Sequence, residues 1–280
     1  MFYRETVISF SPLVFILCYR YTLIAFSMKI IAVVNQKGGS GKTPTAVHLA
    51  FALSRAGKRV LFIDTDAQAS ASLHFLGLKY KNQNPTLYNA ITTLTRIDPL
   101  IISPTIHLIP THDELERAEV ELTAKPGYFY QVQLAKLLRQ YPGYDYCIID
   151  TPGSRISIFT TLALTAANLV IVPVKTEFSA HQATLDTMSL IEDVKSGLNP
   201  QLALWGILPN QYESNVLHHQ EILDLLREQY KTLVYEPSRK TTKYNDAMAA
   251  KTDVGQLDPL LSEYWNKLAG NVIGKGEAEL

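Results

Sequence analysis

The chain has 280 residues, of which 47% are hydrophobic, so it can form a sizeable buried core and is not a disordered chain. Its 26 basic and 26 acidic residues balance, which excludes a global electrostatic attraction to DNA; any DNA contact needs a local patch. The two cysteines, Cys18 and Cys147, form no spaced pair, which excludes a disulfide framework and a cysteine metal motif.

The first 27 residues differ in character from the rest of the chain. Val7–Phe26 is apolar and aromatic and about long enough to span a bilayer, but Arg20 lies within it and costs roughly 2.5–3.5 kcal/mol on insertion scales. No small-residue cleavage site follows, which argues against a signal peptide. We expect residues 1–27 to be a non-domain extension, translated upstream of a true start at Met28; a membrane tether and a soluble extension are the alternatives.

From Met28 onward, short β-branched runs alternate with longer amphipathic segments. Nearly continuous apolar runs, typical of strands covered on both faces, are Ile30–Val34, Val60–Asp64, Ile106–Pro110, Tyr146–Asp150, Leu169–Val174, Leu204–Pro209 and Leu233–Glu236. Helical spacing of apolar residues occurs in Thr45–Arg55, Gln182–Val194, Val216–Tyr230 and Pro259–Ile273. The alternation predicts an α/β fold with a mostly parallel sheet and helices on both faces.

A glycine-rich segment lies between the first predicted strand and the first helix. Glycines let successive backbone N–H groups point at phosphate oxygens, and the helix N-terminus adds a favourable dipole. Lys42 can reach the β- and γ-phosphates, the Thr43 hydroxyl can ligate Mg²⁺, and Pro44 is tolerated in the first helical turn. The segment therefore predicts a nucleotide phosphate loop made of Lys37, Gly38, Gly39, Ser40, Gly41, Lys42, Thr43 and Pro44.

This loop departs from the standard Walker A pattern, because Gln36 stands where the first glycine is expected. It fits the deviant pattern K-G-G-x-G-K-[ST], which has a second lysine at Lys37. In this respect the chain resembles the ParA/MinD family of P-loop ATPases. The resemblance implies a P-loop fold over residues 28–280 as one domain. It also implies that Lys37 crosses a dimer interface to the partner's nucleotide, so that Lys37 and Lys42 both serve catalysis.

Two predicted strands end in carboxylates. The second strand runs into Asp64 and Asp66, which resemble the family's D-x-D-P-Q segment, although Ala67 replaces the proline. The resemblance implies that Asp66 orients the attacking water and that Asp64 lies near the Mg²⁺ shell. A later strand ends in Asp150 and resembles a Walker B segment, where a carboxylate accepts a hydrogen bond from Mg²⁺-bound water. Gly153 then gives the following switch loop freedom to respond to the γ-phosphate.

Two further sets of residues are candidates for binding. Asn210 follows the strand Leu204–Pro209, where the family often reads the adenine base; asparagine is also common in turns, so both interpretations stay open. Basic residues gather near the C-terminus and could neutralise DNA phosphates, with a solvated loop and helix face as the alternative. The members of this basic cluster are Arg239, Lys240, Lys243 and Lys251.

The motifs and the resemblance together imply a slow, partner-stimulated ATPase that uses ATP and Mg²⁺. In the family, ATP closes a homodimer with the nucleotide sandwiched between protomers, and the dimer binds non-specific DNA until an adaptor, such as a ParB-like protein, stimulates hydrolysis. We therefore expect a cytoplasmic, nucleoid-associated partition protein that segregates plasmid or chromosome DNA or positions a protein organelle such as a carboxysome.

Two other functions remain as alternatives. A MinD-like, membrane-associated division regulator would carry a basic amphipathic helix at its C-terminus, whereas the tail Gly274–Leu280 is short and partly acidic, so membrane binding is not expected. The second alternative function is that of a metabolic P-loop enzyme, such as nitrogenase iron protein or dethiobiotin synthetase. Nitrogenase iron protein needs cluster-binding cysteines that Cys18 and Cys147 do not supply, and Lys37 weighs against the synthetase.

Overall fold

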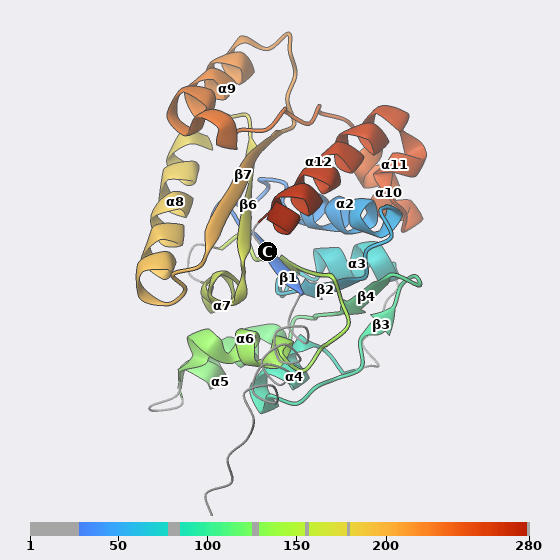
Figure 1. The fold of residues 1–280 in the computed structure, drawn as a ribbon, viewed down its shortest axis with the longest axis vertical. Helices are drawn as coiled ribbons and strands as arrows, with labels where there is room; N and C mark the ends of the chain where they lie inside the picture. The colour runs from blue at the N-terminus through green and yellow to red at the C-terminus, as the bar shows by residue number, and fades with distance from the viewer. Residues whose placement is uncertain (1–27, 78–84, 125–128, 155–156, 178–179, 279–280) are drawn as a thin grey trace, which may run out of the picture.

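The computed structural model describes residues 28–77, 85–124, 129–154, 157–177 and 180–278 (Figure 1). The expected extension 1–27 lies outside the described residues. A seven-stranded sheet in the order β3-β4-β2-β5-β1-β6-β7 forms the centre, and it is parallel except for β3, which pairs antiparallel to β4. The strands are β1 (Lys29–Val33), β2 (Val60–Asp64), β3 (Leu100–Ile101), β4 (Ile106–Ile109), β5 (Tyr146–Asp150), β6 (Leu169–Lys175) and β7 (Ala203–Asn210).

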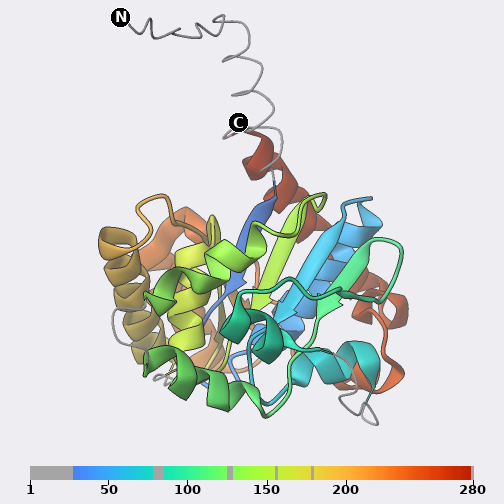
Figure 2. The same ribbon diagram turned by 90° about the horizontal axis from the view of Figure 1, so that it is seen from below.

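Helices cover both faces of the sheet (Figures 1 and 2). One face packs against α2 (Lys42–Arg55), α3 (Ser70–Leu76), α10 (Lys243–Ala250), α11 (Val254–Leu257) and α12 (Pro259–Ala278). The other face packs against α4 (Leu87–Thr93), α5 (Leu115–Thr123), α6 (Gln133–Leu138), α7 (Ile158–Ala166), α8 (Ala180–Gly197) and α9 (Leu217–Tyr230). The predicted α/β fold with a mostly parallel, doubly covered sheet is confirmed.

Successive side chains of the central strands enter different cores, because a strand points alternate residues to opposite faces. In β1, Ile31 and Val33 belong to the core beneath α2 and α12, whereas Ala32 belongs to the core beneath α6 and α7. Both sides are apolar, and this explains why the sequence of these strands is a continuous apolar run. Cys147 of β5 is also fully buried, as expected of a core residue.

The prediction of a strand at Leu233–Glu236 is wrong. The chain forms a 3₁₀ turn at Lys231–Leu233 and then contacts β7 only at isolated points, through a Tyr235 N–H to Ile207 carbonyl bond and a Ser238 N–H to Pro209 carbonyl bond. Pro237 lies between these two donors and has no N–H to give to the ladder. The segment therefore runs along the edge of β7 without becoming an eighth strand.

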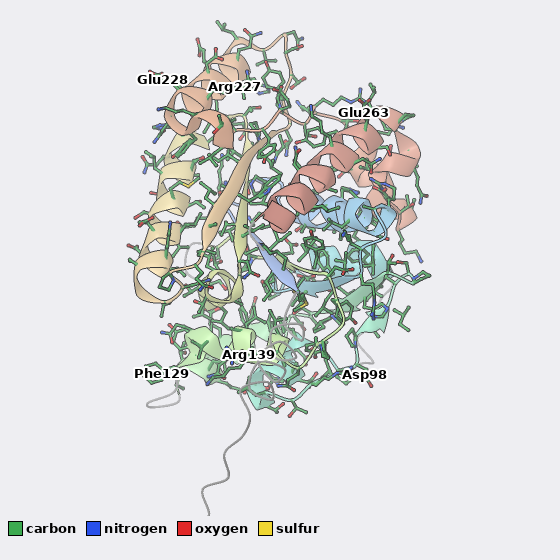
Figure 3. All side chains as sticks on the ribbon, in the orientation of Figure 1. Asp98, Phe129, Arg139, Arg227, Glu228 and Glu263 are labelled. Atoms are coloured by element: carbon green, nitrogen blue, oxygen red, sulfur yellow. The ribbon has the colours of Figure 1, made fainter. Side chains whose placement is uncertain are left out.

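The last helix is longer than the pattern predicts. We expected it to end at Ile273, but α12 continues to Ala278. Gly274 and Gly276 lie within it, since an isolated glycine costs a helix only about 1 kcal/mol and does not end it. Charged side chains such as Arg227 on α9 and Glu263 on α12 point outward (Figure 3). Within the described part of the chain, no helix combines the length and apolar character needed to cross a bilayer.

Candidate functional site

The phosphate loop joins β1 to α2 at the carboxyl edge of the sheet. Gly39 and Gly41 have φ angles of 72° and 90°, which side-chain-bearing residues rarely adopt. Asn35 fixes the start of the loop, because its Nδ2 donates to the Pro173 carbonyl at 2.8 Å and its Oδ1 accepts from the Lys37 N–H at 2.8 Å. The loop is thereby tied to β6, the neighbouring strand.

Lys42 is the buried cation of the loop, with 6% of its surface exposed. Its Nζ donates to the Lys37 carbonyl at 3.0 Å. Burial lowers the pKa of Lys42, while the nearby carboxylates of Asp150 and Asp66 oppose that shift. The ammonium group therefore lies beside the Lys37 carbonyl and near these two carboxylates, where a bound phosphate group would also interact with its charge.

Lys37, the second lysine of the loop, is half-buried and turned onto its own chain. Its Nζ lies 3.5 Å from Oε2 of Glu177, which follows β6 and also pairs with Lys175. The two lysines lower the pKa of Glu177, with Lys175 contributing the larger effect. The importance of Glu177 as the partner of Lys37 could not be read from the sequence, because the two residues are distant along the chain.

Asp150, at the end of β5, is fully buried, and neither carboxylate oxygen has a hydrogen-bond partner within 3.5 Å among the described residues. Burial and the neighbouring carboxylate of Asp64 raise the pKa of Asp150 well above its usual range, which the Thr43 hydroxyl and the Lys42 ammonium partly oppose. Buried carboxylate oxygens without partners are costly, so a ligand is expected to satisfy them. Hydrated Mg²⁺ fits, because it prefers carboxylate and hydroxyl oxygens.

Asp64 is the direct neighbour of Asp150, since the two residues are paired in the β2–β5 ladder. It is also fully buried, but its oxygens are occupied: Oδ2 accepts from both N and Oγ of Ser72 at 2.8 Å, and Oδ1 accepts from the Asp66 N–H at 3.1 Å. Burial raises the pKa of Asp64 to about 6 despite these bonds. The sequence did not single out Ser72, which holds this carboxylate in place.

Asp66 lies on the other side of the loop from the β7 edge and is half-buried. It lines a cavity of about 590 Å³ together with Gly38 and Gly153. A Cβ atom added to Gly153 would lie 3.0 Å from the Gly38 Cα and 3.3 Å from the Lys42 Nζ, so the switch loop touches the phosphate loop. The structure thus brings Asp66 and the switch loop together around Gly38.

A second cavity, of about 530 Å³, lies beside β7 and the start of α2. Asn210 lines it and donates from Nδ2 to the Ser40 carbonyl at 2.6 Å, whereas its Oδ1 has no partner within 3.5 Å among the described residues. A Cβ atom on Gly41 would lie only 2.5 Å from that Nδ2. Asn210 thus contacts the loop and offers an acceptor. The rest of the lining includes Pro44, Ser238, Arg239, Lys240, Tyr244, Tyr264 and Trp265.

The structure divides the predicted basic cluster. Arg239 pairs with Asp258, and Lys240 lies 2.8 Å from a Glu213 oxygen; both basic residues line the cavity beside Asn210. The other two members belong to α10. Lys243 is its first residue, 3.6 Å from a carboxylate oxygen of Asp246, and Lys251 is its C-cap. DNA binding by these four residues stays a prediction.

Comparison with known proteins agrees with this geometry. The family model described as an AAA domain matches residues 28–204. The chromosome-partitioning ATPase Soj of Thermus thermophilus is 36% identical over 217 residues, which is 76% of this chain and 81% of that protein. The chain is a P-loop ATPase of the ParA/MinD type. The chromosome partitioning protein ParA of Myxococcus xanthus is likewise 36% identical, over 74% of each chain.

Solved structures give the same fold. The McdA protein of Cyanothece in its nucleotide-free form superposes with a TM-score of 0.78 at 22% identity, over 88% of this chain and 99% of that one. The cobyrinic acid a,c-diamide synthase of Mycobacterium smegmatis, solved with ADP and magnesium, gives a TM-score of 0.67 at 30% identity, over 80% of this ParA/MinD-type chain and 91% of that one. Nucleotide with magnesium is therefore found in a solved protein of this fold.

Proposed function

We propose that this protein is a partition ATPase that binds ATP with Mg²⁺ at the phosphate loop and hydrolyses it slowly to ADP and phosphate. The loop amides and Lys42 bind the phosphates, and Thr43, Asp64 and Asp150 would hold the hydrated Mg²⁺, which supplies charge neutralisation when bound. Asp66 orients a water molecule for attack on the γ-phosphate. The adenosine end occupies the cavity beside β7, where Asn210 contacts the base.

The observation that carries the proposal is the buried carboxylate of Asp150, whose oxygens have no hydrogen-bond partner within 3.5 Å among the described residues although Thr43 and Lys42 lie near enough to oppose the rise in its pKa. A carboxylate in that state needs a cation or a donor, and the neighbouring hydroxyl and ammonium are the groups that P-loop ATPases use around Mg²⁺ and phosphate. The similarity to partition proteins supports the biological role, since Soj and ParA are both named for chromosome partitioning.

The proposed switch is a change between monomer and dimer that is controlled by the bound nucleotide. ATP would join two copies, and Lys37 would leave Glu177 and reach the nucleotide of the partner subunit. The dimer would bind DNA non-specifically in the cytoplasm, at the nucleoid, until a ParB-like or other adaptor stimulates hydrolysis. The cargo would be plasmid or chromosome DNA, or a protein organelle. Residues 28–280 would act as the single ATPase domain, with 1–27 outside it.

Binding of the protein to random-sequence duplex DNA tests this proposal when measured with ATP, with ADP and without nucleotide. The proposal expects binding with ATP alone, together with a mass in solution that doubles with ATP. ATP-dependent binding to anionic liposomes without DNA binding would favour a MinD-like regulator. If neither DNA binding nor liposome binding depended on nucleotide, the proposed switch would be refuted. The ATP site would then be tested separately with Lys42→Ala.

A further inference from the structure

Helix α3 connects the candidate ATP site to the C-terminal helices. It begins shortly after Asp66 and lies between β2 and α10 in the layer that also holds α2 (Figure 1). Its seven residues contain two polar side chains that are almost fully buried, Ser72 and His74. Buried polar side chains are expensive unless they are bonded, so their bonds show what this helix holds.

Ser72 faces the ATP site. Its side chain is fully buried, its N–H and Oγ both donate to Asp64 Oδ2 at 2.8 Å, and its Oγ accepts from the Thr111 N–H at 3.0 Å. The hydroxyl thus donates one bond and accepts another, and it fixes one oxygen of Asp64 relative to α3 and to the residues that follow β4. Any movement of Asp64 must either break these bonds or move the helix.

His74 faces the opposite way. Its Nε2 lies 2.9 Å from the Thr252 carbonyl, in the turn between α10 and α11. A carbonyl only accepts, so Nε2 carries the proton of this ring. Burial lowers the pKa of His74 to about 4, which keeps the ring neutral at physiological pH. The ring therefore acts as a fixed donor that holds the backbone of Thr252.

The same turn is held from α2. The Val254 N–H donates to Nδ1 of His48 at 3.3 Å, and Arg55 pairs with the buried carboxylate of Asp253. Nδ1 of His48 also lies 3.5 Å from Asp253, but the Val254 N–H occupies its lone pair and burial lowers its pKa to about 3. The contact is therefore not an ion pair at neutral pH. Among the described residues, the bond from His74 to the Thr252 carbonyl is the only side-chain hydrogen bond that joins this turn to α3.

The basic residue Lys251 lies at the start of this turn. It caps α10 with a φ of 53°, and its aliphatic stem contacts the end of α3: a Cβ atom added to Gly77 would lie 2.9 Å from the Lys251 Cδ. Helix α3 thus touches the ATP site at one end and a candidate DNA-contacting lysine at the other.

We propose that α3 couples the nucleotide state of the ATP site to the α10–α11 surface, with Ser72 as the positioning residue for Asp64 and His74 as the positioning residue for Thr252–Val254. When nucleotide and Mg²⁺ are bound, a shift of Asp64 would pass through the bonds of Ser72 into α3 and through the His74 bond to the turn that holds Lys251. The coupling to DNA affinity rests on the proposed function, whereas the coupling between nucleotide and the turn does not need DNA.

Amide hydrogen exchange of the full chain, with and without ATP and Mg²⁺, tests the connection directly. We expect nucleotide to slow exchange in the phosphate loop and to change exchange at residues 243–257 in the wild type. His74→Phe keeps an aromatic ring beside Phe51 and Phe75 but removes the donor, so it should lower the change at 243–257 by at least about 5-fold. Protection of the phosphate loop should persist.

Matched variants make the result specific. His74→Gln retains a donor near the Nε2 position and should restore the change at 243–257. His107→Gln removes a histidine that contacts Tyr144 on the far side of the sheet. This variant should leave the nucleotide-induced change in exchange at 243–257 unaltered. An unaltered response in His74→Phe, or a wild type whose phosphate loop is protected while 243–257 does not respond, would overturn the coupling. A wild-type phosphate loop without protection would refute the ATP site itself, and the coupling with it.

Ser72 is tested by its effect on Mg²⁺. Ser72→Ala removes one bond to Asp64 and should lower kcat and raise the Mg²⁺ concentration for half-maximal activity, each by about 10-fold, with little change in the KM for ATP. Ser72→Thr retains the hydroxyl and should restore both values. Equal loss in Ser72→Ala and Ser72→Thr, or a loss confined to KM, would show that the residue only supports packing.

Discussion

The two cavities beside the phosphate loop are built in different ways. The cavity at Asp66 is lined by Gly38 of the phosphate loop, by the segments 65–68 and 152–154 that follow two paired strands, and by residues of α5 and the start of α7, among them Glu116 and Glu119. The cavity at Asn210 takes its lining from β7, α2, α10, α12 and the segment Ser238–Thr242. The cavity at Asp66, called the phosphate side below, suits the chemistry of phosphate transfer. The cavity at Asn210, called the base side below, is lined by aromatic and amide side chains and suits the recognition of a base. The experiments below test whether the two sides separate in function.

Lys42→Ala should have the largest effect, because Lys42 serves both sides. Its ammonium lies near Asp66 and Asp150, and removing it eliminates the charge that binds the phosphates. We expect nucleotide affinity to fall below detection, roughly 1,000-fold or more, in a titration with a fluorescent ATP analogue. Lys195→Ala, on the exposed part of α8, is the matched control and should bind normally. Normal ATP affinity in Lys42→Ala would remove the loop from the site.

Asp66→Ala should affect the phosphate side alone. Nucleotide binding should remain, because Asp66 is half-buried and its carboxylate accepts a hydrogen bond from the Gln68 N–H and interacts with Lys42 through charge, so its removal leaves Lys42 and the loop amides in place. Turnover should fall by about 100-fold or more, the usual loss when a group that orients or activates water is removed, and the ATP-bound dimer should accumulate. Asp98→Ala, at an exposed position remote from the site, is the control (Figure 3). Unchanged single-turnover hydrolysis would exclude Asp66 from the mechanism.

Asn210→Ala should affect the base side alone. It removes the buried Oδ1 acceptor of a residue that lines the cavity, so ATP affinity should fall by up to about 10-fold, the value of one hydrogen bond, and the preference for ATP over GTP should shrink. The rate of hydrolysis at saturating ATP should hardly change. Asn199→Ala removes an asparagine that bonds the Leu164 and Ala167 carbonyls away from both cavities and serves as the control. A fall in saturated kcat with unchanged affinity would show that the two sides do not separate.

The same contrast explains which features the sequence predicts. The strands other than the short β3, the phosphate loop, and the positions of Asp64, Asp66 and Asp150 at or just after strand ends were readable, because each of these features lies within or next to an apolar run. Ser72 and Glu177 were not singled out as partners, since their roles depend on contacts with residues distant along the chain or on the turn of a short helix. Leu233–Glu236 was misassigned because its composition favours a strand, whereas the neighbouring proline prevents pairing.

The basic cluster gives the smallest expected effect and the sharpest test of the comparison. Arg239 and Lys240 line the base-side cavity and pair with acids, whereas Lys243 and Lys251 belong to α10. Lys243→Glu with Lys251→Glu should weaken ATP-dependent DNA binding a few-fold and reduce its salt slope by about 1 for each lost phosphate contact, with ATP affinity preserved.

The matched pair, Arg239→Glu with Lys240→Glu, should behave differently. If all four residues form one DNA surface, as the sequence alone predicts, both pairs flatten the salt slope equally. The cavity geometry instead predicts that this second pair also weakens ATP binding, because the side chains lie beside Asn210 and their substitution places acids where the nucleotide binds. DNA binding would then fall through loss of the ATP state, and its salt slope at saturating ATP would recover. A flattened slope that persists at saturating ATP would return Arg239 and Lys240 to the DNA surface.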